Sequence, residues 1–539
     1  MAQAPGLSAA LGAHQHTFET ALRQLTDSGF GRRLLEKDPT LWNGDQAAIA
    51  NRLGWLTVAQ TMSQRLPELT AFATEVRDAG FERVVLLGMG GSSLAPEVMS
   101  TTFGVAAGHP PLLLLDTTDP ATIVAAEQSL DLERNLFVVS SKSGTTTETA
   151  SLQRYFATRC LKPLANFIAI TDPGTPLADQ AKAEGFRRLF LNPADVGGRF
   201  SALSYFGLVP AAAIGIDLAR LLDSATATGT RAAIELGAML GGLALDGRDK
   251  VTFVATPSLR GFGAWAEQLL AESTGKLGKG IVPVDGEPLG APGVYGDDRV
   301  FVYLRLTGES GPEAELRALE AAGHPVITIT LADRYDLGGE LLRWEIATAA
   351  AGAVLGINPF DEPNVAEAKE RTGEILRQGL PSDGRPNTSQ GDAVLSGLLE
   401  AARSGDYFAI LAYIQRTPDH DQLLTRLRVT IRDRTRLATN VGYGPRYLHS
   451  TGQLFKGGPD TGIFLQIVAD DTVDLPIPGA TYTFGALKRA QAQGDLQALE
   501  SRGRRAVRLD LGAGATAALE RIVSDLEAQK RSAAPAAGG

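Results

Sequence analysis

The chain has 539 residues, and its 51 Lys and Arg against 61 Asp and Glu give a formal net charge of −10 at pH 7. This length predicts several packed units, and 44% hydrophobic with 21% charged residues is ordinary for a globular protein. The acidic balance argues against general nucleic-acid binding, which needs a basic surface, but it does not exclude a small anionic substrate.

The single cysteine, Cys160, excludes internal disulfides and any metal site built from several cysteines. The N-terminus lacks a basic start followed by an apolar stretch, and no uninterrupted apolar run reaches the roughly 18 residues of a membrane span. The sequence also has no HExxH motif and no His/Asp cluster at metal-ligand spacing. We therefore expect a cytoplasmic protein with no membrane partner, no nucleic-acid partner, no metal and no other cofactor.

The first 80 residues are expected to form an N-terminal helical segment, because a loose helical stripe of apolar residues runs through it. From residue 81 the chain alternates short apolar runs with helical patterns, at 83–87, 112–115, 136–139, 167–170 and 188–191. Such alternation predicts a first α/β domain over 81–245, a parallel sheet with helices on both faces. Ligands of such sheets bind at the carboxyl ends of the strands.

A second set of runs, at 251–255, 300–304 and 326–330, predicts a similar domain over 246–379. The polar segment 380–391 contains Pro and Gly and is expected to be a linker. Residues 392–530 are expected to form a third unit, and the Ala- and Pro-rich residues 531–539 a flexible tail.

The first motif, LGMGGSSL at 87–94, directly follows the first predicted strand. Glycines such as Gly91 let the backbone approach an anion, and Ser92 with the following helix N-terminus can donate hydrogen bonds to it. A plain strand–turn–helix junction explains this pattern equally well.

The second motif, SKSGTTTET, places six hydroxyls and Lys142 between Ser141 and Thr149, again after a strand. Thr145 with Glu148 fits a capping box, so a helix is expected to begin here. Hydroxyls, backbone N–H groups and a helix N-terminus together favour a phosphate pocket. The alternative is a helix start with more capping residues than it needs.

The third motif, VGGRFS at 196–201, places Arg199 on a glycine-bounded loop. A guanidinium there can stabilise a developing oxyanion. The alternative is a surface arginine in a turn.

The fourth motif contains Gln268 and Glu272, which are four residues apart and share a helix face with Trp265. Partial desolvation is expected to raise the pKa of Glu272 above about 4.3 and to suit it as a general base. The alternative is a solvated Glu before a glycine that ends the helix.

The fifth motif, INPFDEPNVAEAK at 357–369, predicts a helix that begins near Pro363 and carries Lys369 about two turns along. The sixth, YLHSTGQ at 447–453, places His449 in a polar loop, where it can exchange a proton near neutral pH. Alone, the fifth motif indicates only a capped helix, and a single histidine is more often structural.

In this order, the motifs resemble those of the glucose-6-phosphate isomerase family, whose members have two sugar-isomerase (SIS) domains. The resemblance covers about 82–370, and the chain also looks like the isomerase half of transaldolase–isomerase fusions. It implies an α/β fold with two SIS-type (flavodoxin-like) parallel-sheet domains and a C-terminal α/β extension. It further implies a homodimer that interconverts glucose 6-phosphate and fructose 6-phosphate in glycolysis and gluconeogenesis, through ring opening and a cis-enediol(ate).

The resemblance also implies roles for twelve residues. Gly91 and Ser92 would contact the sugar, and Gln268, one turn before the base, would also contact the substrate. The phosphate would be held by Ser141, Lys142, Ser143, Thr146 and Thr149. Glu272 would transfer the proton and Arg199 would stabilise the enediolate. Lys369 and His449 would assist ring opening.

Two features depart from the family. Glu362 stands where the family usually has Gln, and His449 follows Lys369, whereas the family's histidine precedes its lysine motif. We hypothesise that the third unit returns His449 to the site, in its own or a neighbouring subunit. The alternatives are a bifunctional phosphoglucose/phosphomannose isomerase and a non-catalytic SIS sugar-phosphate sensor. The isomerase half of an amidotransferase fits poorly, because no N-terminal nucleophilic cysteine is present.

Overall fold

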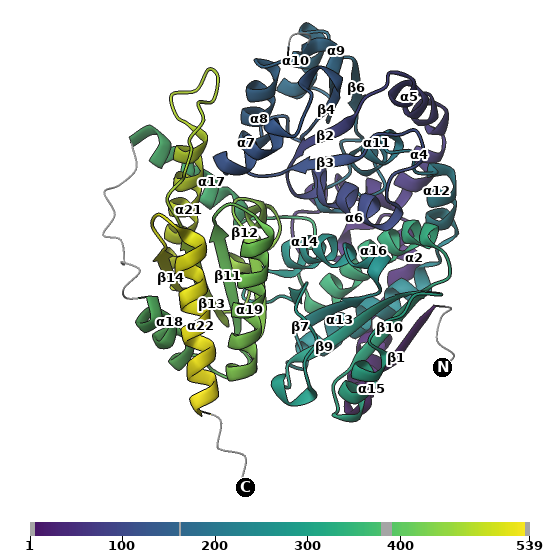
Figure 1. Ribbon diagram of the computed structural model, residues 1–539. Coiled ribbons are helices and arrows are strands. Elements are labelled where there is room, and N and C mark those ends of the chain that lie inside the picture. Colours follow the sequence, from purple (N-terminus) through teal and green to yellow (C-terminus); the bar gives the residue numbers. More distant parts are fainter. Residues whose placement is uncertain (1–5, 161–162, 379–390, 534–539) are drawn as a thin grey trace.

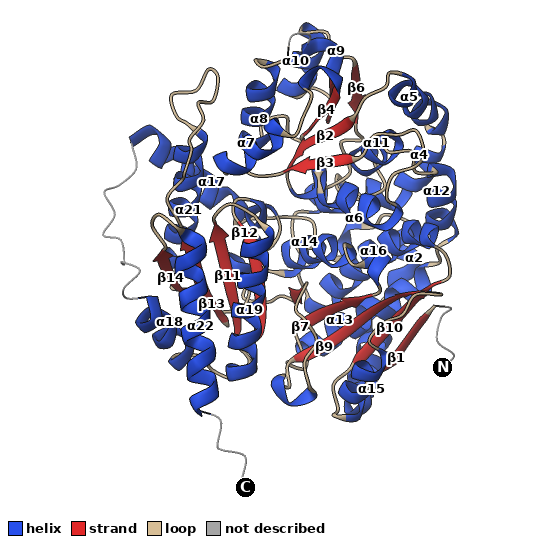
Figure 2. Cartoon of the chain, viewed as in Figure 1, coloured by secondary structure: helices blue, strands red, loops and turns tan. Residues whose placement is uncertain are grey.

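The computed structural model describes residues 6–160, 163–378 and 391–533. It contains three β-sheets in three parts of the molecule, each flanked by helices (Figures 1 and 2). This architecture confirms the predicted α/β fold with two parallel-sheet domains and a C-terminal α/β extension.

The first sheet has the strand order β3-β2-β4-β5-β6, with every neighbouring pair parallel. Its strands are β2 (Arg83–Gly88), β3 (Leu112–Leu115), β4 (Asn135–Ser140), β5 (Phe167–Thr171) and β6 (Arg188–Leu191). All five predicted runs are therefore strands.

The second sheet has the order β1-β10-β9-β7-β8, in which only β1 is antiparallel to its neighbour. Its strands are β1 (Leu7–Ala10), β7 (Lys250–Ala255), β8 (Val282–Val284), β9 (Arg299–Leu306) and β10 (Val326–Leu331). The three predicted runs are β7, β9 and β10. Strand β1 lies within the segment that we expected to be helical. These residues form a strand because they pair with β10, and nothing near them in the sequence indicates that pairing.

The third sheet has the order β12-β11-β13-β14, with all pairs parallel. Its strands are β11 (Tyr407–Tyr413), β12 (Ala438–Tyr443), β13 (Gly462–Val468) and β14 (Arg505–Asp510). This third unit lies beside the first two sheets, at the left of Figure 1.

Helices cover the sheets and fill the centre of the molecule. Those before the third unit are α1 (Gln15–Asp27), α2 (Phe30–Leu35), α3 (Gln46–Ala50), α4 (Val58–Ser63), α5 (Leu66–Asp78), α6 (Leu94–Phe103), α7 (Pro120–Gln128), α8 (Thr147–Ala157), α9 (Pro163–Asn166), α10 (Pro176–Ala183), α11 (Tyr205–Ala213), α12 (Leu218–Ala227), α13 (Thr230–Leu245), α14 (Phe262–Thr274), α15 (Glu313–Ala321), α16 (Leu337–Leu355) and α17 (Val365–Gln378). The third unit adds α18 (Gly391–Glu400), α19 (Pro418–Thr435), α20 (Gly452–Gly457), α21 (Phe484–Ser501) and α22 (Ala515–Ala533). None of the helices in the described ranges is long and apolar enough to cross a membrane.

Residues 531–533 of the predicted flexible tail continue α22 to Ala533, and the flexibility of the tail stays a prediction. The other residues of that tail, and the predicted linker apart from Gly391, lie outside the described residues. Gly391 itself begins α18.

Alternate side chains of the first sheet enter two different cores. Val84 and Leu86 of β2 join a large core that continues through the N-terminal helices to the second sheet. Val85 and Leu87 enter a separate core on the opposite face. Both faces of β2 are therefore buried, as expected for a parallel strand between helix layers.

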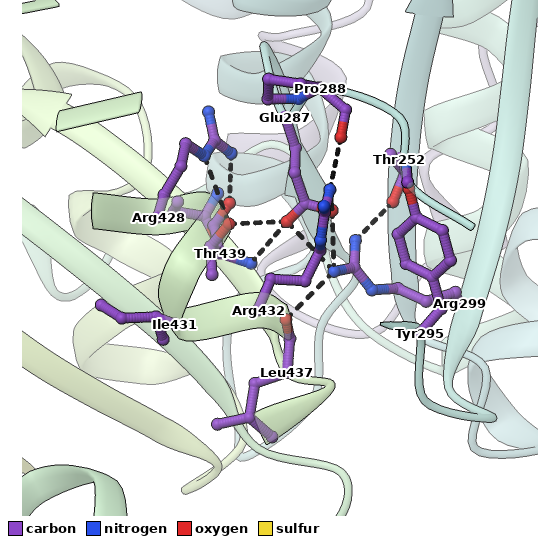
Figure 3. Close-up of polar contacts among 12 residues, drawn as sticks. Thr252, Glu287, Pro288, Tyr295, Arg299, Arg428, Ile431, Arg432, Leu437 and Thr439 are labelled. Atoms are coloured by element: carbon purple, nitrogen blue, oxygen red, sulfur yellow. Dashed lines mark hydrogen bonds and ion pairs between the residues drawn. The ribbon is translucent and has the colours of Figure 1, made fainter. Parts of the chain in front are cut away.

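A buried ionic network joins the third unit to the second sheet (Figure 3). Arg299 of β9 donates from Nη2 to Glu287 Oε1 at 2.9 Å, and both side chains are 0% exposed. Glu287 Oε2 accepts from the hydroxyl of Thr439 on β12 at 2.6 Å. Arg428 and Arg432 of α19 complete the network, with Arg432 Nη1 at 3.9 Å from Glu287 Oε1. Because an unpaired buried charge costs several kcal/mol, this network specifies how the two parts dock.

The third unit also contributes to the core of the first sheet. Ile477, Phe484 and Leu487 are buried in the same cluster as the outer face of β2. Next to them, Lys488 forms an ion pair with Asp119 at 2.8 Å. The third unit is thus anchored to both of the other sheets.

Candidate active site

The loop after β2 lies against the loop that carries Arg199. The short 3₁₀ turn η4 (Gly90–Ser92) contacts the turn η6 (Gly198–Phe200) so closely that a Cβ on Gly91 would lie 2.0 Å from the Gly198 carbonyl oxygen. Gly90 also has a left-handed φ of +53°. Only glycine fits at both positions. The close approach places the loop of Arg199 against the first motif, in which Ser92 is also buried.

Arg199 is only 5% exposed, so it is not a surface arginine in a turn. Its guanidinium donates to Ser273 Oγ at 3.0 Å, Pro359 O at 2.9 Å, Asp361 O at 2.8 Å and Glu362 Oε2 at 2.8 Å. The third, fourth and fifth motifs therefore meet at one side chain.

Glu272 lies at the buried end of α14, and Gln268 donates to its Oε2 at 3.1 Å. Arg199 Nη1 is 3.7 Å from the same oxygen. Burial raises the pKa of Glu272 and the charge of Glu362 raises it further, which outweighs the opposing effect of Arg199. The direction agrees with the prediction for this carboxyl. We refer to Glu272, Gln268 and Arg199 as the Glu272 group.

Glu362 behaves in the opposite way. Burial alone would raise its pKa, but the charge of Arg199 and the hydrogen bond from it lower the pKa below the usual value. Because Arg199 pairs closely with Glu362, its positive charge stabilises the ionised form of Glu272 less.

The helix predicted to begin near Pro363 is present and begins two residues after it. Helix α17 begins at Val365, so Lys369 lies about one turn along it. The preceding loop folds over Arg199, and Asp361 Oδ1 also binds Lys276 Nζ at 2.7 Å. Burial lowers the pKa of Lys276 to about 8.

The predicted capping box at Thr145 and Glu148 is wrong. Helix α8 begins at Thr147 after Thr146, with no hydrogen bond from the capping side chain. Hydroxyl groups in this loop bond to one another, Ser141 Oγ to Thr146 Oγ1 at 2.9 Å and Thr145 Oγ1 to Ser143 Oγ at 3.0 Å.

Two of the residues predicted to contact the phosphate, Lys142 and Thr149, do not line the cavity described below. Lys142 Nζ forms an ion pair with Asp172 and a hydrogen bond with Ala194 O at 3.2 Å. Thr149 is 2% exposed, and its hydroxyl has no hydrogen-bond partner among the described residues. Their assigned contacts with a phosphate stay predictions.

Glu148 binds His449 instead of capping its own helix. His449, in the turn η11 (Arg446–His449), places Nε2 at 3.0 Å from Glu148 Oε1. Gln491 of α21 donates to the same Oε1 at 2.7 Å. Burial alone would raise the pKa of Glu148, but the charge and hydrogen bond of His449 lower it below its usual value.

A cavity of about 620 Å³ opens at this pair. Among its lining residues are Ser143, Thr146, Glu148, Lys369, His449 and Lys456. The third unit therefore brings His449 to the hydroxyl-rich loop of its own chain, with the exposed Lys369 in the same cavity. We refer to His449, Glu148 and Lys369 as the His449 group.

The two groups meet at Gly90. A Cβ there would lie 2.7 Å from the His449 carbonyl oxygen and 2.8 Å from Gln268 Nε2. The charge of His449 also contributes to the pKa of Glu272. The Glu272 group and the His449 group are therefore neighbours across Gly90, although the residues of the Glu272 group do not line the 620 Å³ cavity.

Sequence reasoning missed the partners that hold these residues. The sequence indicates Glu148 only as part of a capping box and Asp361 only as a residue at a helix start, and it indicates no role for Gln491 or Lys276. The position of Glu148 within the hydroxyl-rich motif could have indicated a role in the site, whereas nothing in the sequence around Gln491 indicates one. In the described part of the chain, no three or more His, Cys, Asp or Glu side chains cluster as metal ligands would.

Comparisons with known proteins agree on one family. A family model described as "Phosphoglucose isomerase" matches residues 70–233. "Glucose-6-phosphate isomerase" of Rubrobacter xylanophilus is 30% identical over 413 residues, covering 65% of this chain and 95% of that protein. "Probable glucose-6-phosphate isomerase" of Methanococcus maripaludis is 29% identical over 384 residues, covering 61% of this chain and 85% of that protein.

Solved structures resemble the chain over similar lengths. A hypothetical protein from Thermus thermophilus superposes with a TM-score of 0.58 at 26% identity, covering 69% of this chain and 99% of the other. A glucose-6-phosphate isomerase from Chlamydia trachomatis superposes with a TM-score of 0.54 at 20% identity, covering 74% of this chain and 92% of the other. At 20% identity, the second match is a likeness of fold alone.

Proposed function

The chain belongs to the glucose-6-phosphate isomerase family, and we propose that the two groups divide the work of interconverting glucose 6-phosphate and fructose 6-phosphate. It is an enzyme of the isomerase class. The overall reaction moves a proton between two neighbouring carbons and turns an aldehyde into a ketone. The substrate arrives as a closed ring, so ring opening must come first.

The substrate phosphate is held by the hydroxyl-rich loop, where Ser143 and Thr146 line the cavity at the start of α8. Their hydroxyls and the positive end of the helix suit a phosphate. Anchoring the phosphate fixes the position of the reacting carbons at the other end of the sugar.

His449 and Lys369 exchange protons with the ring oxygen and the anomeric hydroxyl, and so open the ring. The hydrogen bond to Glu148 engages His449 Nε2, which leaves Nδ1 for proton exchange. The same hydrogen bond fixes the orientation of the imidazole ring.

Glu272 removes the proton beside the carbonyl carbon and returns it to the adjacent carbon. A carboxyl with a raised pKa can hold that proton between the two steps. Arg199 stabilises the negative charge of the enediolate. The observation that carries this function is the buried Glu272 carboxyl, 3.7 Å from the Arg199 guanidinium and hydrogen-bonded to Gln268.

The decisive assay follows conversion of fructose 6-phosphate to glucose 6-phosphate and measures mannose 6-phosphate in the same sample. We expect glucose 6-phosphate to form. Binding without turnover would contradict the proposal and favour a sugar-phosphate sensor. Mannose 6-phosphate formed at a comparable rate would assign the bifunctional phosphoglucose/phosphomannose activity, since both epimers share one enediol. No specific observation favours either alternative.

The sugar phosphate is the only partner proposed for the site. We place the enzyme in glycolysis and gluconeogenesis, in the cytoplasm, as a homodimer; family membership supports these assignments. Because His449 reaches Glu148 of its own chain, a dimer is not needed to complete the His449 group. Light scattering at assay concentrations tests the dimer, and a monomeric mass would contradict it.

A further inference from the structure

One face of α21 carries three buried polar side chains. Lys488, Gln491 and Asp495 are 3%, 4% and 0% exposed, and their spacing of three and four residues places them on the same face. Buried polar groups are costly unless they are hydrogen-bonded, so such a face indicates specific partners.

Each of the three binds a different part of the surroundings of the His449 group. Lys488 pairs with Asp119 at the end of the first sheet, at 2.8 Å. Asp495 accepts from Tyr447 in η11 at 2.6 Å and pairs with Lys456 at 2.5 Å. Between them, Gln491 is the residue of this face that contacts Glu148.

The amide of Gln491 is held from both sides. Thr118 donates its hydroxyl to Gln491 Oε1 at 2.7 Å, and Gln491 Nε2 donates to Glu148 Oε1 at 2.7 Å. The reverse orientation would set the amide oxygen against a carboxylate oxygen, where neither can donate. The amide of Gln491 therefore has one favourable orientation. It donates to the same Oε1 of Glu148 that lies 3.0 Å from His449 Nε2.

We propose that Gln491 is a positioning residue that holds the Glu148 carboxylate against His449, and so promotes ring opening without contacting the substrate's reacting atoms. This inference rests on the proposed role of His449. Without Gln491, the carboxylate can rotate away from the imidazole, and the ring nitrogen that exchanges the proton is no longer fixed. The effect is confined to the His449 group, because the side-chain hydrogen bonds of Gln491 run to Thr118 and Glu148 and bypass the Glu272 group.

The test replaces Gln491 with Leu in the full chain and compares two substrates. Fructose 6-phosphate must open its ring, whereas an aldotetrose 4-phosphate cannot form one because its ring-closing hydroxyl is esterified. We expect kcat on fructose 6-phosphate to fall about tenfold with KM unchanged, as for other residues that orient a reacting group through a hydrogen bond. Solvent deuterium incorporation into the tetrose phosphate should stay within about twofold of wild type.

The matched control is Gln493→Leu on the same helix. Gln493 accepts from Arg508 at 2.6 Å, away from the cavity, so this variant removes a comparable side chain without touching Glu148. It should leave both activities unchanged. Thr118→Val supplies a second test should Gln491→Leu fail to fold, and it should lower turnover of fructose 6-phosphate selectively but less.

The failures are distinguishable. If His449→Ala lowers turnover of fructose 6-phosphate but Gln491→Leu and Thr118→Val do not, the role of Gln491 is overturned and the function stands. An equal fall on both substrates would also overturn it, because it would indicate a structural role. If His449→Ala itself has no selective effect, the proposed ring-opening role fails first.

Discussion

The Glu272 group and the His449 group differ in where their residues come from. Glu272, Gln268 and Arg199 lie within 73 positions of one another and belong to the part of the chain that precedes the third unit. Glu148 and His449 are separated by 301 positions and meet only because the third unit docks on the first sheet. A site can therefore join one half that short motifs specify and another half that depends on the packing of whole units.

The pKa of the buried carboxyl is shifted in opposite directions in the two groups. The pKa of Glu272 is raised, whereas that of Glu148 is lowered. Both are buried, so burial alone does not decide the direction. Glu148 has His449 beside it, whereas Arg199, which pairs with Glu272 at 3.7 Å, lies closer to Glu362, at 2.8 Å.

The largest effect is expected for Glu272→Gln, which removes the proposed base of the Glu272 group. We expect proton exchange at C2 to fall about 10⁴-fold, because the amide cannot accept the proton, with substrate binding retained. Solvent deuterium incorporation measures the exchange, and calorimetry measures binding. Retained exchange would remove Glu272 as the base.

Docking of the third unit is tested by Glu287→Gln. Arg299 would keep a buried charge without a carboxylate partner, so we expect the free energy of unfolding to fall by about 3 kcal/mol. Denaturant titration measures the change. Glu36→Gln is the control, because its ion pair with Arg32 is exposed (54% and 71%), and such pairs contribute under about 1 kcal/mol. Equal changes in the two variants would contradict a docking role for the network.

Glu148→Gln separates the two groups directly. Losing the carboxylate that faces His449 should lower turnover of fructose 6-phosphate about 10²-fold, while deuterium exchange on an open-chain sugar phosphate changes little. Measuring both in one preparation removes errors in enzyme concentration. Parallel losses would show that the groups do not act on separate steps.

The smallest expected effect is a shift in pH dependence in Glu362→Gln. Glu272 must be ionised to accept a proton, so activity is lost as the pH falls through its raised pKa. Glu362 contributes to that raised pKa, and without its charge the Arg199 guanidinium lowers the pKa of Glu272 more effectively, so the acid limb of kcat/KM should move to lower pH. The exposed Glu370→Gln should leave the limb in place. A limb that stays or rises in Glu362→Gln would refute this assignment.

Much of the fold and half of the site follow from local patterns. The strands of the first sheet were predicted because each is a short apolar run before a polar turn, and Gln268 with Glu272 because helix periodicity puts them on one face. Arg199 could be proposed from its loop, although its burial could not.

The remaining features depend on contacts between distant positions. Glu148 fitted a local capping rule, but its partner is His449, and nothing near either residue indicates the pairing. Strand β1 pairs with β10 more than 300 residues later. Gln491 lies in an Ala- and Gln-rich helix where only the docked structure distinguishes it from its neighbours.

The insertion of Ile477, Phe484 and Leu487 into the first sheet's core has a consequence for synthesis. On the ribosome the first sheet emerges long before these residues do, and domains usually fold as they emerge. Here the outer layer of the first sheet lacks part of its apolar cover until nearly the whole chain has been made. Translation order thus delays completion of the His449 group until the third unit has been made, and a prematurely terminated chain would expose an apolar surface to other nascent proteins.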